Sequence, residues 1–142
     1  MNKAFEKFNT KKLVEDGAKI YLYDNEGNLT DNWIRVVNED SKIFKLAKAE
    51  YDRLVANGKV ERTPENWAKY VLAKCIIEWG GPTLDNVKFI LENVQELLDL
   101  APNIATQVMD LLFSPFFFKL ARASSSNGAS DSSDSASATT KE

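Results

Sequence analysis

The chain has 142 residues, of which 44% are hydrophobic, and a formal net charge of −3. This length and composition fit one folded domain with room for a tail, and the balance of charge argues against the basic surface of a nucleic-acid-binding protein. The sequence contains no histidine and a single cysteine, Cys75, so the usual general base and zinc ligand are missing and no disulfide can form within the chain. We therefore expect no enzyme, no cofactor and no metal site, and a protein of a reducing compartment.

The N-terminal part of the chain predicts a short helix followed by a β-hairpin. The helix covers residues 4–14. Residues 19–23 and 33–37 alternate and are rich in β-forming side chains, which is typical of strands. The turn-forming residues 24–28 lie between them, so the two strands are predicted to pair. A calcium loop is rejected here because position twelve of the best EF-hand alignment falls on Trp33 instead of a glutamate.

Two helices are predicted after the hairpin. The first starts near Glu39, where Asn38 or Asp40 suits the N-cap, and ends at Asn57-Gly58. The second covers residues 63–79, because a threonine followed by a proline is a typical helix start. Its apolar residues spread over more than one face, so we expect it to be the most buried helix.

Some residues of this second helix, and the glycine pair that ends it, could suggest a functional site, but the sequence favours a structural role for each. Cys75 is interpreted as a small buried hydrophobe. Trp67 and Trp79 are interpreted as core. The pair Gly80-Gly81 lacks the other glycines and the Lys-Ser/Thr of a phosphate-binding loop, so a helix–helix turn is predicted there.

Two more helices are predicted before the tail. Thr83 suits the N-cap of the third, which covers residues 84–98. Its acidic side chains lie on a face predicted to be solvated: Glu92, Glu96 and Asp99. Pro102 starts the fourth helix, which covers residues 102–112, and Ser114-Pro115 is predicted either to kink this helix or to start a new one.

The predicted fold class is therefore α+β, mainly α, with an N-terminal β-hairpin followed by about four helices. Residues 1–123 are predicted to form a single globular domain. Residues 124–142 are mostly Ser, Ala, Thr and Asp, with no large apolar side chain. Such a segment cannot build a core, so a disordered C-terminal tail is predicted.

The aromatic residues just before the tail are the best candidate for a binding site. Phe113, Phe116, Phe117 and Leu120 have i, i+3, i+4, i+7 spacing, so on one helix they would form a single apolar stripe. Two interpretations remain open. The stripe packs on the earlier helices as core, or it contacts a partner as a helix-in-groove ligand or an oligomer contact.

No segment predicts export or membrane insertion. The N-terminal lysines are not followed by the apolar stretch of a secretory signal. The longest apolar run, residues 111–118, is too short to cross a bilayer. We therefore expect neither a membrane nor a nucleic acid among the partners.

Four stretches share their order and spacing with a known family. They are the hairpin from Ile20-Tyr21-Leu22-Tyr23 to Trp33-Ile34-Arg35-Val36, the helix start Asp40-Ser41 with Phe44, the helix end Ile76-Ile77-Glu78-Trp79-Gly80, and the run from Thr83-Leu84-Asp85 through Leu97-Leu98 to Pro102 and Ile104-Ala105-Thr106-Gln107-Val108. Over about residues 13–122, this order resembles the tail assembly chaperones of long-tailed bacteriophages.

The resemblance implies a virus-encoded, non-enzymatic assembly factor of the host cell cytoplasm that is not retained in the mature virion. Its implied partners are the tape-measure protein and the tail-tube protein, and a homo-oligomer is also possible. Many family members have a longer form made by programmed ribosomal frameshifting. The resemblance assigns no binding residues, so the aromatic stripe remains a hypothesis from the residues alone.

Two other classes of function stay open. One is a structural tail component, such as a terminator or connector protein, which would persist in the virion. The other is a small adaptor that binds a host protein, which affinity capture from infected cells would detect.

Overall fold

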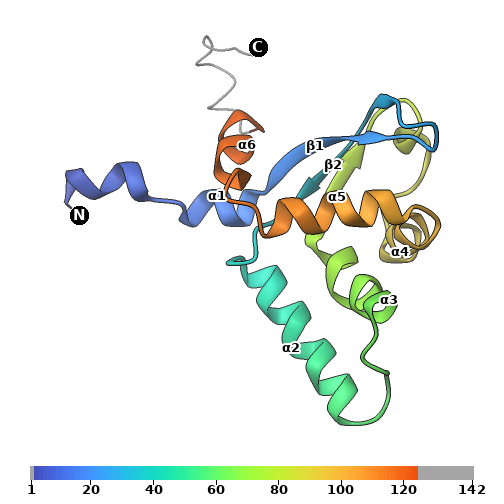
Figure 1. Cartoon of the computed structure of the whole chain (residues 1–142). Helices are drawn as coiled ribbons and strands as arrows, with labels where there is room; N and C mark the ends of the chain where they lie inside the picture. The colour runs from blue at the N-terminus through green and yellow to red at the C-terminus, as the bar shows by residue number, and fades with distance from the viewer. Residues whose placement is uncertain (1, 125–142) are drawn as a thin grey trace.

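A computed structural model describes residues 2–124. These residues form an α+β fold that is mainly helical, with one three-stranded antiparallel sheet. In Figure 1 the sheet lies at the top, helices α2 to α5 lie below it, and α6 stands beside β1. The α-helices after the hairpin are α2 (Lys42–Ala56), α3 (Pro64–Trp67), α4 (Leu91–Leu100), α5 (Pro102–Leu112) and α6 (Phe117–Ser124). The tail predicted for residues 124–142 lies outside the described residues, apart from Ser124, which is the last residue of α6.

The helix predicted for residues 4–14 is two separate pieces. A 3-10 helix, η1, covers Lys3–Phe8, and α1 covers Lys11–Asp16. Asn9 lies between them, with extended backbone, and its side chain accepts a hydrogen bond from the N–H of Lys11 at 3.2 Å. Residues 2–10 project from the body of the molecule (Figure 1), and we call them the arm.

The predicted hairpin is confirmed. Strand β1 covers Ala18–Tyr23 and pairs antiparallel with β2, Leu29–Val36. Between them the Asp24 carboxylate accepts hydrogen bonds from the N–H groups of Glu26 and Asn28, both at 2.9 Å. These bonds add to the backbone hydrogen bonds of the turn, from the N–H of Asp24 to Asn28 and from the N–H of Gly27 to Asp24, and this is the polar hairpin turn expected from the sequence.

Helix α2 starts three residues later than predicted. The hydroxyl of Ser41 accepts a hydrogen bond from the N–H of Phe44 at 3.1 Å, so Ser41 is the N-cap, rather than Asn38 or Asp40. The helix ends as predicted, and Gly58 follows it with φ +71°, a conformation that glycine adopts without strain.

The next helix starts as predicted but is shorter. The Thr63 hydroxyl accepts a hydrogen bond from the N–H of Asn66 at 3.1 Å, and Pro64 is the first helical residue. The helical segment consists of α3, a π-helical turn η2 (Ala68–Leu72) and a 3-10 turn η3 (Ala73–Cys75). It therefore ends at Cys75, four residues before the predicted end at Trp79.

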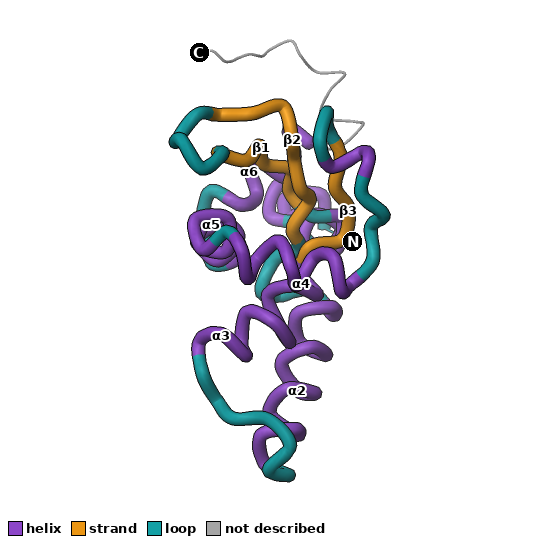
Figure 2. The backbone as a smooth tube through the Cα atoms, turned by 90° about the vertical axis from the view of Figure 1, so that its right-hand side faces the viewer, coloured by secondary structure: helices purple, strands orange, loops and turns teal. Residues whose placement is uncertain are grey.

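The residues after Cys75 form a third strand, and the helical prediction was wrong for them. Strand β3, Ile76–Gly80, pairs antiparallel with β2. Arg35 lies opposite Glu78, and the two side chains form an ion pair at 2.9 Å. Two isoleucines and a tryptophan around one charged residue suit a strand as well as a helix. The segment is a strand because β2 has a free edge with which it can pair. Figure 2 shows the resulting three-stranded sheet.

Gly80 is the last residue of β3 and Gly81 follows the strand, so the predicted helix–helix turn is also corrected. A Cβ atom on Gly80 would lie 2.6 Å from a ring carbon of Trp33, which shows that the indole packs directly on this glycine. Gly81 has φ +117°, and a Cβ atom there would lie 2.5 Å from the Cα of Asn32. The Asn32 carboxamide oxygen accepts a hydrogen bond from the N–H of Thr83 at 2.8 Å, which fixes the turn.

The predicted third helix begins later than expected. Only a 3-10 turn, η4 (Leu84–Asn86), precedes residues 87–90, which are neither helix nor strand, and α4 follows. The indole N–H of Trp79 donates to the carbonyl oxygen of Val87 at 3.1 Å, and the ring of Phe89 packs edge-on against this indole with centroids 5.2 Å apart. These contacts hold the segment against Trp79 of β3.

Helices α5 and α6 cover the outer edge of β1. The side-chain amide of Gln107 donates to the carbonyl of Tyr21 at 3.2 Å and accepts from the N–H of Tyr23 at 3.5 Å. The Ser124 hydroxyl accepts from the N–H of Lys19 at 2.9 Å. These side chains bind backbone groups that an edge strand would otherwise offer to another chain.

Ser114-Pro115 starts a new helix rather than kinking the previous one, because α5 and α6 are bent by 97° to each other. Among residues 2–124, no single helix is long and apolar enough to cross a membrane. The pair α5 and α6 passes that test only when the two helices are counted together across their bend.

Cys75 is buried, as predicted, and its exposed fraction is 0%. Burial raises the pKa of its thiol to about 12. Because the thiolate is the reactive form, we expect no reaction with Ellman's reagent at mildly alkaline pH in the folded protein, and one thiol per chain in guanidinium chloride. A rapid reaction of the folded protein would show that the helix end at Cys75 opens readily.

Candidate partner-binding surface

The four residues predicted to form one stripe do not share a helix. Phe113 is the C-cap of α5, Phe116 precedes α6, and Phe117 and Leu120 lie within α6. The 97° bend between the two helices turns the residues after Ser114 in a new direction. The single stripe expected from the spacing is therefore absent. The interpretation as core applies to some of its residues, and the interpretation as a partner contact applies to others.

Phe117 is core. Its exposed fraction is 0%, and Ala121, one helical turn later, is 1% exposed. Phe118 packs edge-on against Phe117, with ring centroids 5.6 Å apart. These residues form the inner face of α6 and hold the helix against β1.

Phe113 is half-exposed and held in place by other rings. Its exposed fraction is 44%. Phe44 of α2 contacts it edge-to-face, with centroids 5.9 Å apart, and Trp67 of α3 stacks on it at 6.3 Å. Three helices therefore fix the orientation of this ring while nearly half of it faces outward.

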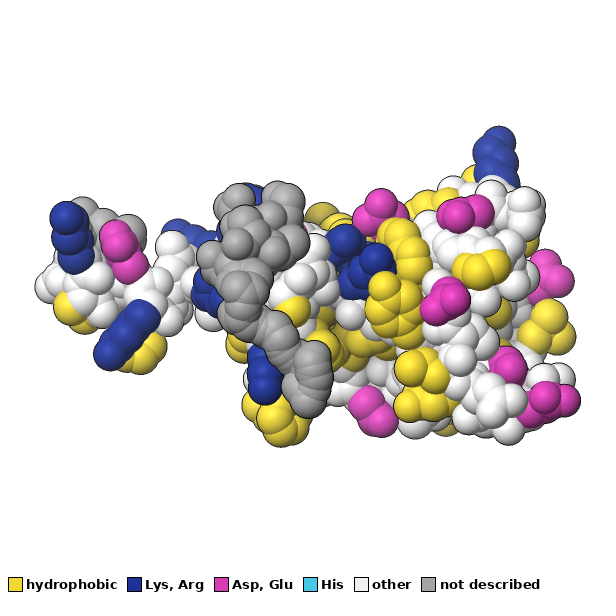
Figure 3. Space-filling model, turned by 90° about the horizontal axis from the view of Figure 1, so that it is seen from above, with side chains coloured by type: hydrophobic (Ala, Val, Ile, Leu, Met, Phe, Trp, Pro, Cys, Tyr) yellow, Lys and Arg dark blue, Asp and Glu magenta, His cyan; other side chains and the backbone are white. Residues whose placement is uncertain are grey.

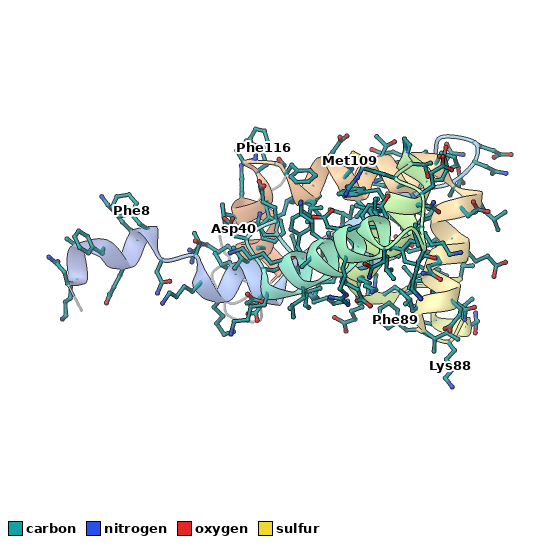
Figure 4. The ribbon with its side chains drawn as sticks, turned by 90° about the horizontal axis from the view of Figure 1, so that it is seen from below. Phe8, Asp40, Lys88, Phe89, Met109 and Phe116 are labelled. Carbon is teal, nitrogen blue, oxygen red and sulfur yellow. The ribbon has the colours of Figure 1, made fainter. Side chains whose placement is uncertain are left out.

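Phe116 lies directly before the first residue of α6, and Leu120 lies on the outer face of this helix. Their exposed fractions are 69% and 38%. The N–H of Leu120 donates to the carbonyl of Phe116 at 3.2 Å, so the two residues are one helical turn apart. Figure 4 shows that Phe116 projects away from the body. We call Phe113, Phe116 and Leu120 the aromatic surface.

A second surface is a groove of about 730 Å³ between α3, η2, α4 and α5. Its apolar lining includes Leu72, Leu98, Ala105 and Met109. Four carboxylates also line it: Glu65, Glu92, Glu96 and Asp99. Lys69 is the one basic residue among the described residues of the lining. We call this feature the acidic groove, and its volume is in the range of sites that take side chains or small ligands.

The sequence did not predict the acidic groove. The spacing of Glu92, Glu96 and Asp99 indicated a solvated helix face, and the three residues are indeed exposed. The groove exists because η2 and α5 both pack on α4, and no local pattern specifies that arrangement. The position of Met109, four residues before Phe113 on the same side of α5, places one end of the groove near the aromatic surface.

The described residues show no constellation that suggests chemistry. Among them, no group of three His, Cys, Asp or Glu side chains is placed to hold a metal ion. A hydrogen bond from Lys74 lowers the pKa of Glu50, and hydrogen bonds from Lys48 and Arg62 lower the pKa of Asp52. Both carboxylates are thus in surface ion pairs.

Comparisons with protein families, with curated proteins and with solved structures give no match to this chain. What the protein binds is therefore inferred from its residues and surfaces.

Proposed function

We propose that this chain is a tail assembly chaperone of a long-tailed bacteriophage, which binds the tape-measure protein and assists assembly of the tail tube without being an enzyme. The resemblance over about residues 13–122 supports the family. One of its four stretches, Ile76–Gly80, is a strand and not the end of a helix, so the support comes from the order of the stretches and not from their helical structure.

The aromatic surface is the observation that carries the proposal. A long, apolar, helical client needs apolar contacts that shield it from water, and burial of one phenylalanine side chain contributes about 1.5–3 kcal/mol. Phe116 offers most of its side chain for such a contact. Phe113 is already held by Phe44 and Trp67, so it loses little conformational entropy when a client binds.

The proposed place of action is the host cell cytoplasm, and the proposed protein is absent from the mature virion. A structural tail component would instead persist in the particle. Mass spectrometry of purified virions distinguishes these two functions, because only the structural component would be found at a fixed copy number.

The direct test is co-expression with the tape-measure protein encoded beside this chain, followed by size-exclusion chromatography with light scattering. We expect a soluble complex with the wild-type chain and an insoluble tape-measure protein when it is expressed alone. With Phe116→Ser we expect at least a tenfold loss of complex, which corresponds to about 1.4 kcal/mol, because the variant removes an exposed apolar contact.

Leu100→Ser is the matched control. Leu100 is 72% exposed, like Phe116, but it lies at the end of α4, far from α6 (Figure 1). Both variants should keep the circular dichroism spectrum of the wild type. If F116S and L100S retained the same amount of tape-measure protein in solution, the aromatic surface would not be the client-binding site.

A further inference from the structure

The arm carries exposed aromatic and basic side chains together. Phe5 and Phe8 are 62% and 69% exposed, and η1 buries none of its residues. In a 3-10 helix, residues i and i+3 lie on the same face, so the two rings point the same way. Lys3 and Lys7 lie on the same short helix, and the Lys7 ammonium is 5.2 Å from the centroid of the Phe8 ring. Figure 3 shows basic, acidic and hydrophobic side chains next to each other on the arm, whose acidic residue is Glu6.

The acidic groove has the complementary chemistry. Its apolar lining suits aromatic rings, and its carboxylates outnumber its single lysine. Glu92 and Glu96 lie one turn apart on α4 and are both exposed. Opposite charges placed across an interface favour encounter and fix the register of the two surfaces.

The arm of one molecule points away from the groove of the same molecule. In Figure 1 the arm extends beyond α1 on one side, whereas α3 and α4 lie on the opposite side. Figure 4 shows Phe8 far from the α4 and α5 end of the molecule. Only Asn9 and Thr10 link η1 to α1, and α1 packs against α6, so this short link, which spans at most about 7 Å, keeps the arm on the α1 side of the molecule. A second copy is therefore the occupant that this geometry favours.

We propose that the arm of one copy docks in the acidic groove of a second copy. Phe5 and Phe8 contact the apolar lining, and Lys3 and Lys7 lie near Glu92 and Glu96. The contact is heterologous, because the arm and the groove are different surfaces, so repeating it produces a ring or an open chain of subunits. The inference goes beyond the proposed function, since it requires neither the client nor Phe116.

Sedimentation velocity of the full chain over a wide range of concentrations tests the proposal. We expect the wild type to self-associate, and added salt to weaken the association because surface charges are screened. F5S/F8S and E92K/E96K should each raise the dissociation constant at least tenfold. All four positions are exposed, so these variants should keep their fold by circular dichroism.

Matched controls use exposed residues outside both surfaces. Leu46→Ser removes a side chain that is 71% exposed on α2, and E26K/E39K reverses two exposed charges. Both controls should associate like the wild type. If the controls lost association as strongly as the arm and groove variants, the effect would be general and the proposal would fail.

A charge exchange gives the sharpest test. K3E/K7E has an acidic arm and a native groove, and E92K/E96K has a native arm and a basic groove. Each variant should be monomeric alone, because its arm and its groove have the same sign. A mixture of the two should associate, because each arm then meets a groove of opposite sign. A mixture that stays monomeric while the wild type associates would contradict the pairing of these charges.

A cross-link identifies which chain supplies the arm. A photoreactive amino acid at position 8, in an equal mixture of heavy-isotope-labelled and unlabelled chains, should form cross-links to α4 or α5 that join heavy and light peptides. Cross-links that join only peptides of the same isotope would place the arm in its own groove and overturn the proposal. A wild type that is monomeric at every concentration would also overturn it, whatever the result with the tape-measure protein.

Discussion

Replacing Phe117 by alanine is expected to lower the free energy of unfolding by about 3–5 kcal/mol, the range for a buried phenylalanine. Phe117 has an exposed fraction of 0% and is among the largest fully buried side chains of the described residues. Removing its ring would leave a cavity between α6 and β1 and weaken the attachment of the whole helix. For a domain with a total stability of about 5–15 kcal/mol, this is a large share. Urea denaturation followed by tryptophan fluorescence measures the change.

The neighbouring residue provides the control. Phe116 is 69% exposed, so Phe116→Ala should change the free energy of unfolding by less than about 1 kcal/mol, as is usual for surface substitutions. The two variants remove the same side chain from adjacent positions. If they destabilised the protein equally, α6 would not be packed as described, and the assignment of Phe117 to the core and Phe116 to the surface would be wrong.

Gly81→Ala is expected to destabilise the protein by about 2–5 kcal/mol, from backbone strain and from overpacking together. The φ angle of +117° belongs to a region that residues with a side chain rarely adopt, and the new methyl group would lie 2.5 Å from the Cα of Asn32. The neighbouring backbone of β2 cannot move away without disturbing the sheet. Thermal unfolding should therefore show a clear decrease of the melting temperature.

Gly58→Ala measures the cost of backbone strain without the steric clash of the added methyl group. Gly58 also has a positive φ, +71°, but a Cβ atom there would meet nothing within 4 Å. We expect only the cost of a left-handed conformation, about 1–2 kcal/mol. Equal melting temperatures for G81A and G58A would mean that the turn after β3 is loose enough to accept a side chain.

The sequence predicted best those features that depend on a few neighbouring residues. Thr63 and Pro64 start their helix because a hydroxyl cap and a fixed φ act within one turn. The hairpin turn at Asp24 is likewise decided locally, by one carboxylate and the N–H groups that follow it. The two predicted caps of α2, Asn38 and Asp40, were both wrong. The Ser41 hydroxyl accepts the hydrogen bond from the first turn, and the Asn38 side chain accepts one from the N–H of Asp40 instead.

The candidate site was predicted only in part. Phe113 and Phe116 are exposed, and so are Phe5, Phe8 and Phe89 elsewhere in the described residues. The helical spacing of the residues before the tail, however, suggested one stripe, and the bend at Ser114-Pro115 divides it. Periodicity holds only while the helix continues, so it could not assign Phe117 to the core and Phe116 to the surface.

The sequence by itself determined the α+β class, the hairpin, the helix starts at Pro64 and Pro102 and the burial of Cys75, because capping, turn formation and apolar periodicity act over a few residues. Only the tertiary structure decided that Ile76–Gly80 is a strand, since that segment needs the free edge of β2, which lies about forty residues earlier in the chain. The acidic groove and the direction of α6 also depend on how distant helices pack. These contacts join residues that are far apart in the sequence, so no short segment of the sequence predicts them.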